Sequence, residues 1–290
     1  MIYLFLSVLV SSSLFVIFKL FERYRVDNFQ AIVFNYFVAF ISGLLLFPPE
    51  GKLMDTFFKP WFVGTIILGV LFISIFLVMA RTAQKNGLSV ASIAGKMSVV
   101  IPVIFAFIVY RESAGWMKIL GIVFALLAVY LASARQKGML TAKDNLLYPG
   151  LLFLGSGIID TLLKYLEVNF VNDQDIPLYS SAIFFNAAWI GTLVMTYRSV
   201  SSKTLTIKPR NIVAGFVLGI PNYFSIYFIL QALRHSVLDS SSIFTINNVA
   251  IVMLTTLFGI LLFRERLLLK NWIGVVLAII SIILITYAKV

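Results

Sequence analysis

The sequence predicts an all-α integral membrane protein with ten transmembrane helices, arranged as two inverted repeats of five helices. Hydrophobic residues make up 61% of the chain and charged residues 12%, with a mean hydropathy of +1.01. A soluble domain would carry about a quarter charged residues. Ten apolar runs each come close to the roughly 20 residues that cross a bilayer. In addition, several short motifs occur twice, once in each half of the chain.

The expected helices lie in two groups of five, separated near residue 138. They cover approximately residues 2–19, 29–47, 61–80, 90–110, 115–134, 146–163, 178–197, 211–232, 242–263 and 271–288. Residues 1–138 form the first predicted repeat and residues 139–290 the second. The connectors are too short to fold alone, so fold and function are both expected inside the bilayer. The first run lacks a basic start and a cleavage site, which indicates a retained helix and not a signal peptide.

The duplication is visible in matching polar positions. The run Tyr110-Arg111-Glu112 returns as Phe263-Arg264-Glu265 at an offset of 153, and Gly121 returns as Gly274 at the same offset. Asn35 returns as Asn186 at an offset of 151. Because five helices per repeat is an odd number, the second repeat must be inserted upside down. Inverted repeats in a membrane chain are typical of a transporter built from two halves.

The net charge of +11 comes from basic residues in the connectors, where they set topology and contact anionic lipid. No nucleic-acid partner is therefore expected. The connectors 1–2, 3–4, 5–6, 7–8 and 9–10 carry fifteen Lys and Arg, against seven on the opposite side. This bias predicts that both termini face away from the cytoplasm. The chain has no cysteine, which excludes disulfides, thiolate metal sites and cysteine nucleophiles, and neither a cofactor nor a metal is expected.

The fourth expected helix contains Pro102, followed by an aromatic-rich run that ends at Arg111-Glu112. The matching segment in the second half runs from Thr255 to Arg264-Glu265. With five-plus-five helices, this pattern resembles the drug/metabolite transporter superfamily, and within it the ten-helix EamA-type branch. The resemblance spans the chain, although the proline occurs only in the first copy. It implies a central cavity lined by both halves, alternating access by rocking, and a small-molecule substrate.

Members of this superfamily move amino acids, sugars, nucleotide-sugars, phosphorylated sugars, drugs and other metabolites. Many keep their termini in the cytoplasm, which is the opposite of the charge count here. The small four-helix members rely on a glutamate in the first helix, where this chain has Ser11-Ser12-Ser13. Cation-for-proton exchange by that route is therefore not expected.

Lys96 is the outstanding polar residue inside an expected helix, because a charge at mid-bilayer costs at least about 2.5–3.5 kcal/mol. Its small neighbours, such as Gly95 and Ser98, leave room for a cavity. The functional interpretation is a cation that binds a carboxylate or phosphate of the cargo. Phosphate-carrying relatives also place lysines on helices four and nine, which implies a similar role. The alternatives are a structural pair with Asp160, or a lysine that reaches back to the membrane surface.

The other candidate binding residues are mostly amides. Asn247 and Asn248 replace Lys96 at the matching depth of helix nine, and one of them is expected to face the cavity. The alternative is that both join neighbouring helices. Asn35 and Asn186 line a symmetric cavity wall or make a symmetric fold contact. Tyr223, beside Pro221, contacts cargo or only packs.

Asp160 is the acidic residue that stands clearly within an expected span, and it has two interpretations. It either pairs with Lys164, four residues on, or serves as the protonation site that couples cargo movement to protons. An enzyme is not expected, since the single histidine, His235, lies in a connector and no nucleophile–base pair is available.

The sequence thus predicts a secondary active transporter of a small organic solute, anionic or zwitterionic, in the inner (cytoplasmic) membrane. A proton or a counter-solute is its expected coupling partner, and membrane lipid surrounds it as a monomer or homodimer. The alternatives are a flippase for a lipid-linked or amphipathic substrate, or an exporter of drugs or amino acids.

Overall fold

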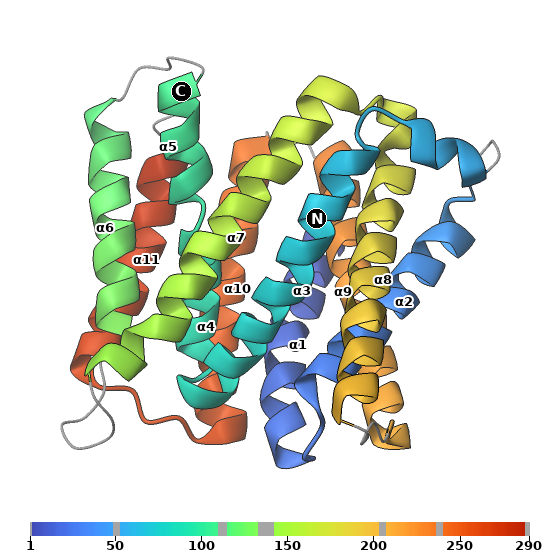
Figure 1. Ribbon diagram of the computed structural model, residues 1–290. Helices are drawn as coiled ribbons and strands as arrows, with labels where there is room; N and C mark the ends of the chain where they lie inside the picture. The colour runs from blue at the N-terminus through green and yellow to red at the C-terminus, as the bar shows by residue number, and fades with distance from the viewer. Residues whose placement is uncertain are drawn as a thin grey trace. The chain divides into compact units, whose positions relative to one another are not determined.

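The computed structural model describes residues 2–48, 53–109, 115–132, 142–202, 207–235 and 240–287 (Figure 1). Within these ranges the chain forms eleven α-helices and two short 3-10 helices, and no strand. The first six α-helices are α1 (Ile2–Arg23), α2 (Asn28–Leu46), α3 (Phe62–Lys85), α4 (Leu88–Met97), α5 (Val100–Val109) and α6 (Trp116–Ala132). The other five are α7 (Ala142–Phe170), α8 (Ile176–Ser202), α9 (Pro209–His235), α10 (Ser240–Phe263) and α11 (Leu269–Tyr287). The 3-10 helices are η1 (Leu53–Phe58) and η2 (Asp173–Asp175).

Seven helices of the described chain are long and apolar enough to cross a membrane, by length and composition. They are α1, α2, α3, α7, α8, α9 and α10. Shorter apolar helical stretches at Leu88–Pro102, Ile119–Leu131 and Leu269–Leu284 occupy the places of expected helices four, five and ten. The all-α membrane class is therefore confirmed, while ten crossings in two inverted repeats stay a prediction.

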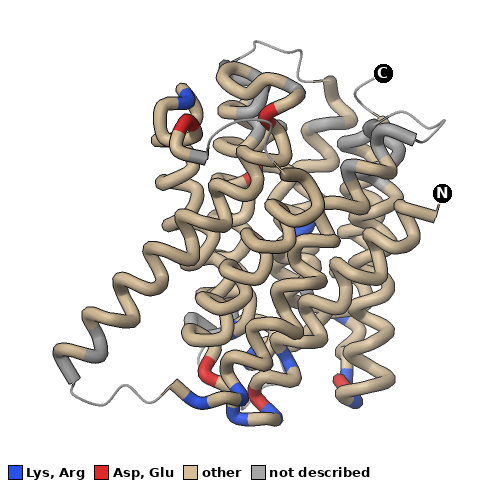
Figure 2. The backbone as a smooth tube through the Cα atoms, turned by 90° about the vertical axis from the view of Figure 1, so that its right-hand side faces the viewer, with Lys and Arg blue, Asp and Glu red and all other residues tan. Residues whose placement is uncertain are grey.

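The surface of the helices suits a hydrocarbon surrounding. On α6, the large side chains of Ile119, Val123 and Leu126 are exposed, whereas Ala125 and Ala128 are fully buried. The small residues thus face other helices and the large apolar ones face outward, as expected when lipid replaces water. Figure 2 shows that Lys, Arg, Asp and Glu gather mainly at the helix ends.

The fourth expected span is not one helix. It was predicted as continuous over residues 90–110, but α4 ends at Met97 and α5 begins at Val100. Pro102 explains the break, because it has no N–H for the carbonyl of Ser98 and its ring crowds that carbonyl. The N–H of Ile101 instead donates to the Ser98 carbonyl at 2.9 Å, which closes a tighter turn.

The chain divides into two compact units, each containing helices from both halves of the sequence. Unit 1 comprises Met1–Lys19, Val78–Ile158 and Phe224–Val290, and unit 2 comprises Leu20–Leu77 and Ile159–Tyr223. The core of unit 1 joins α4, α6, α10 and α11 through residues such as Ile93, Ala125, Val252 and Ala278. The core of unit 2 is centred on Trp61, Leu68 and Tyr179.

In unit 1, α6 and α11 lie side by side and run antiparallel (Figure 1). Ser281 Oγ donates to the Gly121 carbonyl at 2.7 Å, and Asn271 Nδ2 donates to the Leu131 carbonyl at 3.2 Å. Ten residues forward on one helix thus correspond to ten residues back on the other. The helices α4 and α10 are also antiparallel: Thr255 Oγ1 donates to Ser92 Oγ at 2.6 Å, and a Cβ on Gly259 would lie 3.6 Å from Ser89 Oγ.

In unit 2, the antiparallel neighbours are α2 and α8. A Cβ added to Gly43 would collide with Ser181, and one added to Gly191 would collide with Val33. Here too, ten residues back on one helix correspond to ten residues forward on the other. Glycines permit this close approach because hydrocarbon provides no hydrophobic drive between helices and association depends on tight packing.

Two further glycines let α3 and α9 approach the asparagines of their neighbours. A Cβ on Gly69 would lie 2.8 Å from the Ala187 backbone nitrogen, and one on Gly219 would lie 2.7 Å from the Asn35 carbonyl oxygen. We expect Gly69→Ala and Gly219→Ala each to lower the free energy of unfolding by about 1–3 kcal/mol, because backbone atoms cannot yield. Thermal unfolding in detergent measures this.

Gly150→Ala is the matched control, since a Cβ there would meet nothing within 4 Å. It removes a helical glycine without a clash, so its unfolding temperature should stay level or rise slightly. Equal unfolding temperatures for all three variants would contradict the packing explanation.

Candidate functional site

Lys96 lies in the last turn of α4, two residues before the break in the fourth span. The helix is buried from Leu88 to Ala94, but Gly95 and Lys96 are only half-buried. A Cβ added to Gly95 would have nothing within 4 Å. Gly95, the residue before Lys96, therefore faces open space. The C-terminal carbonyls of a helix favour a nearby cation, so α4 itself helps to hold the ammonium group.

The facing helix is α10, which brings both candidate asparagines to the same level. Ser92 of α4 contacts Thr255 of α10, and the two helices run in opposite directions. Counting five residues forward from Ser92 and five back from Thr255 therefore places Met97 opposite Ala250. Lys96 and Asn248 thus lie within one helical turn of that level. Asn247 is buried and Asn248 half-buried. The structure places these three predicted residues on two neighbouring helices of unit 1.

Asn247 has a structural contact. Ser7 Oγ of α1 donates to its Oδ1 at 3.1 Å. This is the interhelical role that the sequence left as one alternative. Adjacent residues of a helix point about 100° apart, so Asn248 faces a different direction. Contact of Asn248 with a solute stays a prediction.

The candidates in unit 2 have partners of their own. Asn35 Oδ1 accepts a hydrogen bond from Asn222 Nδ2 at 3.2 Å, and Asn186 Nδ2 donates to Thr65 Oγ1 at 2.9 Å. All are inside the helix packing, and Asn35 is fully buried. These contacts favour a fold role for the duplicated asparagines over a cavity wall. Tyr223, also buried, lies against Gly43 of α2, as expected for a packing residue.

Asp160, on α7, is exposed on the surface of its unit. The side chain of Lys164, its expected partner four residues on, lies outside the described part of the chain. The choice between an ion pair and a coupling site thus stays a prediction. Across the described residues, no group of three or more His, Cys, Asp and Glu side chains could hold a metal ion.

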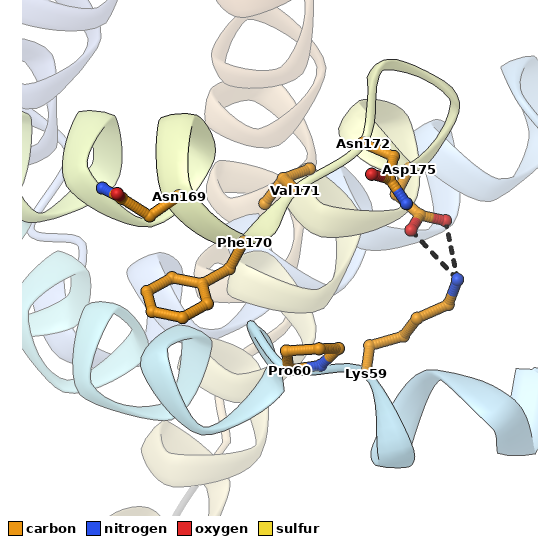
Figure 3. Close-up of a pocket in the computed structure, with 7 residues that line it drawn as sticks. All are labelled: Lys59, Pro60, Asn169, Phe170, Val171, Asn172 and Asp175. Carbon is orange, nitrogen blue, oxygen red and sulfur yellow. Dashed lines mark hydrogen bonds and ion pairs between the residues drawn. The ribbon is translucent and has the colours of Figure 1, made fainter.

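Unit 2 contains a pocket of about 360 Å³ at the helix ends (Figure 3). Seven residues line it: Lys59, Pro60, Asn169, Phe170, Val171, Asn172 and Asp175. Lys59 Nζ donates to both carboxylate oxygens of Asp175, at 3.1 and 3.0 Å. The cation and the anion of the pocket therefore neutralise each other. This pair ties the segment before α3 to the segment before α8, and we read the pocket as a structural junction.

Glu265 belongs to the duplicated Arg-Glu motif, which the sequence indicated to be structural without identifying its partner. Arg264 ends α10 with a positive φ of 52°, and the Glu265 carboxylate then reaches the first turn of α4. Its Oε1 accepts a hydrogen bond from the Leu88 N–H at 2.8 Å, so it caps that helix. Burial raises the pKa of this carboxyl group, which the Leu88 hydrogen bond and the charge of Lys19 partly offset. The first copy, Arg111-Glu112, lies outside the described residues.

Sequence reasoning also missed Ser7, Ser92 and Thr255 as contact residues. Each is a small hydroxyl residue in an apolar run, where nothing in the sequence distinguishes a partnered hydroxyl from a packed one. Their partners are 163 or more positions away. The Glu265 cap spans 177 positions. The one available signal was the repeat itself, which flagged Glu265 without saying what it touches.

Comparison with known proteins gives similarities in family, in sequence and in fold. Residues 1–134 match the EamA-like transporter family. An uncharacterized protein of Haemophilus influenzae is 24% identical over 292 residues, covering 98% of this chain and 97% of the relative. A solved crystal structure, described only as that of a protein, aligns with a TM-score of 0.61 at 14% identity. That alignment covers 99% of this chain and 96% of the other, and it indicates a shared fold.

The matched family is one of transporters rather than enzymes, and several apolar helices make the chain an integral, multi-pass membrane protein. A small-molecule substrate follows from the family. The resemblance to the drug/metabolite transporter superfamily, in its EamA-type branch, is thus confirmed by the match over residues 1–134.

Proposed function

We propose that the protein is a secondary active transporter of the inner (cytoplasmic) membrane that moves a small anionic or zwitterionic organic solute by alternating access. Lys96 binds the anionic group of the solute, and Asn248 and the Asn247 amide contact its polar groups. The observation that carries the proposal is the break in the fourth span directly after Lys96. Discontinuous membrane helices are typical of substrate sites in secondary transporters, because their ends present unpaired backbone groups and helix dipoles.

The depth of Lys96 supports this role. Helices α2 and α8, α4 and α10, and α6 and α11 are the expected repeat mates, and each pair is antiparallel. Inverted repeats are related by a two-fold axis in the membrane plane. Between α4 and α10, Met97 lies opposite Ala250, its own mate at the offset of 153. If the repeats are inverted, the two-fold axis passes between Met97 and Ala250. Lys96 is one residue from Met97, which corresponds to about 1.5 Å along the helix.

That position disfavours the snorkelling alternative. The midplane lies about 15 Å from either edge of the hydrocarbon layer. A lysine side chain at that depth cannot bring its ammonium group to the membrane surface. The charge must be met inside the protein or by cargo, and a compact ammonium group binds carboxylate or phosphate as a point charge. The preceding residue, Gly95, faces open space about 100° around the helix from Lys96.

The symmetry of unit 2 supports the same arrangement. Gly69 and Gly219 are 150 residues apart, and they approach the Asn186 and Asn35 segments, which are 151 apart. Equivalent contacts at equivalent offsets are expected when two repeats fold alike. In the proposed mechanism the two halves rock about a fixed site near the axis, driven by a proton or counter-solute gradient.

The first test is thermal unfolding of the detergent-purified protein against metabolites sorted by charge, for wild type and Lys96→Met. Carboxylates and phosphates should stabilise wild type, because a ligand at a hundred times its dissociation constant adds about 2.7 kcal/mol. The gain should vanish in Lys96→Met, which keeps the side-chain length but not the charge. Lys270→Met, which removes an exposed lysine of α11, serves as the matched control and should respond like wild type.

Anions that fail to stabilise wild type, while cations, apolar compounds or lipid-linked compounds stabilise both proteins equally, would overturn the anion site. The lipid-linked outcome would favour a flippase.

A second test addresses the break. Pro102→Ala supplies an N–H that can replace the Ile101 N–H at the Ser98 carbonyl, so residues 88–109 can form one continuous α-helix. We expect the variant to unfold at a temperature equal to or higher than that of wild type, because Pro102 is the residue that prevents the continuous helix. Amide exchange over residues 98–102 should slow, and stabilisation by the anion should fall. A variant that slows exchange yet binds the anion as wild type does would separate the break from the site.

A further inference from the structure

The short helix α4 has Lys96 at its C-terminal end and the Glu265 carboxylate at its N-terminal end. We propose that the Glu265 carboxyl group is a proton-binding site of this transporter, and that its protonation state controls the hold on the helix that carries Lys96. The coupling part of this proposal rests on the proposed function. It assigns the coupling proton to the Arg-Glu motif of the second half and not to Asp160.

The contact between Glu265 and α4 is made by the carboxylate alone. Its Oε1 lies 2.8 Å from the Leu88 nitrogen, the first residue of the helix. Gly87 has a positive φ of 104° and gives α4 no side-chain cap. A Cβ on Gly87 or on Gly259 would lie 2.9 or 2.5 Å from a carboxylate oxygen. The carboxylate therefore fits between two glycines and replaces the cap that the N-terminus of α4 lacks.

The charged surroundings of Glu265 are simple. From α1, Lys19 acts on the carboxylate electrostatically, and its Nζ donates to the Gln84 carbonyl at 2.6 Å. From α3, Lys85 is exposed and stands over the Tyr148 ring of α7, 4.9 Å from its centroid. On its own segment, Arg264 and Arg266 are exposed.

The parts of α4 and α10 that touch Glu265 are uncharged: Gly87, Leu88, Ser89 and Gly259. Lys19 is therefore the cation whose attraction a bound proton would weaken. The same ammonium group binds the Gln84 carbonyl near the end of α3. The connector between α3 and α4 is therefore held by Lys19 on one side and by Glu265 on the other, and we call these two contacts the clamp. Loss of the Glu265 charge weakens this clamp, because hydrogen bonds to an ionised acceptor are about twice as strong as neutral ones.

Glu265 can exchange protons with water, since it is only half-buried and stands outside the helical spans. Burial raises its pKa above the ordinary value of 4.5, so the folded chain binds the proton more tightly than the unfolded chain. The sign follows directly. The contribution of Glu265 to the free energy of unfolding is fully present below the ordinary pKa. It is lost as the pH rises through the raised pKa of the folded chain.

A buried hydroxyl group also lies close to the Glu265 carboxyl group. Ser89 Oγ is 2% exposed and has no hydrogen-bond partner in the described structure. The Cβ on Gly259 that would meet the Glu265 carboxylate would also lie 3.6 Å from this oxygen. A buried hydroxyl without a partner costs about 1–3 kcal/mol. After a small movement the Ser89 O–H can donate to a carboxyl oxygen of Glu265, whether that group is ionised or protonated.

Movement at one end of α4 reaches Lys96 because the helix is short and bounded by two turns. One turn is at Gly87, and the other is at residues 98–99. Hinges of this kind let a rigid helix shift as a body. A fixed helix cap is the competing explanation, and it predicts no response to protons.

The experiment compares full-length wild type with Glu265→Gln, whose amide oxygen still accepts from the Leu88 N–H but cannot titrate. The wild-type unfolding temperature should fall, relative to Glu265→Gln, as pH rises from about 4.5 toward neutrality. Asp55→Asn removes an exposed carboxylate of η1 and should follow wild type. A wild-type response that persists unchanged in Glu265→Gln overturns the proton site.

Amide exchange of the peptide that covers residues 87–92, compared at matched intrinsic rates, tests the link to α4. Protonation should speed exchange in wild type, whereas Glu265→Gln should exchange at one rate at every pH. Identical profiles in the two proteins overturn control of α4 and leave a fixed cap.

Binding of the stabilising carboxylate or phosphate separates the two proposals. Its apparent dissociation constant should change about 5-fold or more across the titration in wild type and stay constant in Glu265→Gln. The proposed function alone fails when no anion stabilises wild type, although the unfolding temperature and the amide exchange of α4 still depend on pH through Glu265. Both pH dependences should also be present in Lys96→Met. The proton site alone fails when anions bind through Lys96 and Glu265→Gln changes no pH profile.

Discussion

The rest of the structure depends on one constraint, which is that every backbone N–H and C=O inside a bilayer needs a partner from the protein. Helices meet it along their length, so the chain is helical in almost all of its described part. The demand is greatest where one helix ends and the next begins, as between α4 and α5. There the Ser98 carbonyl is satisfied by a 3-10 turn, and Ser98 Oγ donates to the Gly95 carbonyl at 2.6 Å. A helix break whose carbonyl groups are hydrogen-bonded in this way can be stable, and it can expose polar backbone groups among apolar side chains.

The same constraint explains where the polar side chains stand. Thr255 is the repeat mate of Pro102, and its hydroxyl lies 2.7 Å from the Ile251 carbonyl of its own helix and 2.6 Å from Ser92. At one position of the repeat a proline breaks the helix, and at its mate a threonine joins the intact helix to the broken one. Hydrogen bonds between membrane helices are commonly worth about 0.6–2 kcal/mol. Such bonds hold α10 as a continuous support for α4.

The all-α membrane class was predictable from the sequence, because burial in hydrocarbon demands long apolar runs that composition reveals directly. The break at residues 98–99 was not predicted, although Pro102 was noticed, since the run around it is uniformly apolar. The missing backbone N–H of Pro102 causes the break. The duplicated offsets predicted that Asn35 and Asn186 would behave alike, and both make interhelical contacts. Their partners and the Glu265 cap depend on which helices pack together, and periodicity within one helix carries no such information.

The asymmetry of the candidate site has a physical reason within the proposed mechanism. Lys96 has Val249 as its mate, so the charge occurs once although the surrounding helices are duplicated. When inverted halves exchange their conformations, a group far from the two-fold axis changes depth between the two states. A group beside the axis keeps its depth and can hold the same anion in both. One cation is then sufficient, and a second at the mate position would repel it across a short gap in a medium of low dielectric constant. A symmetric scaffold thus favours a single charge, placed next to its axis.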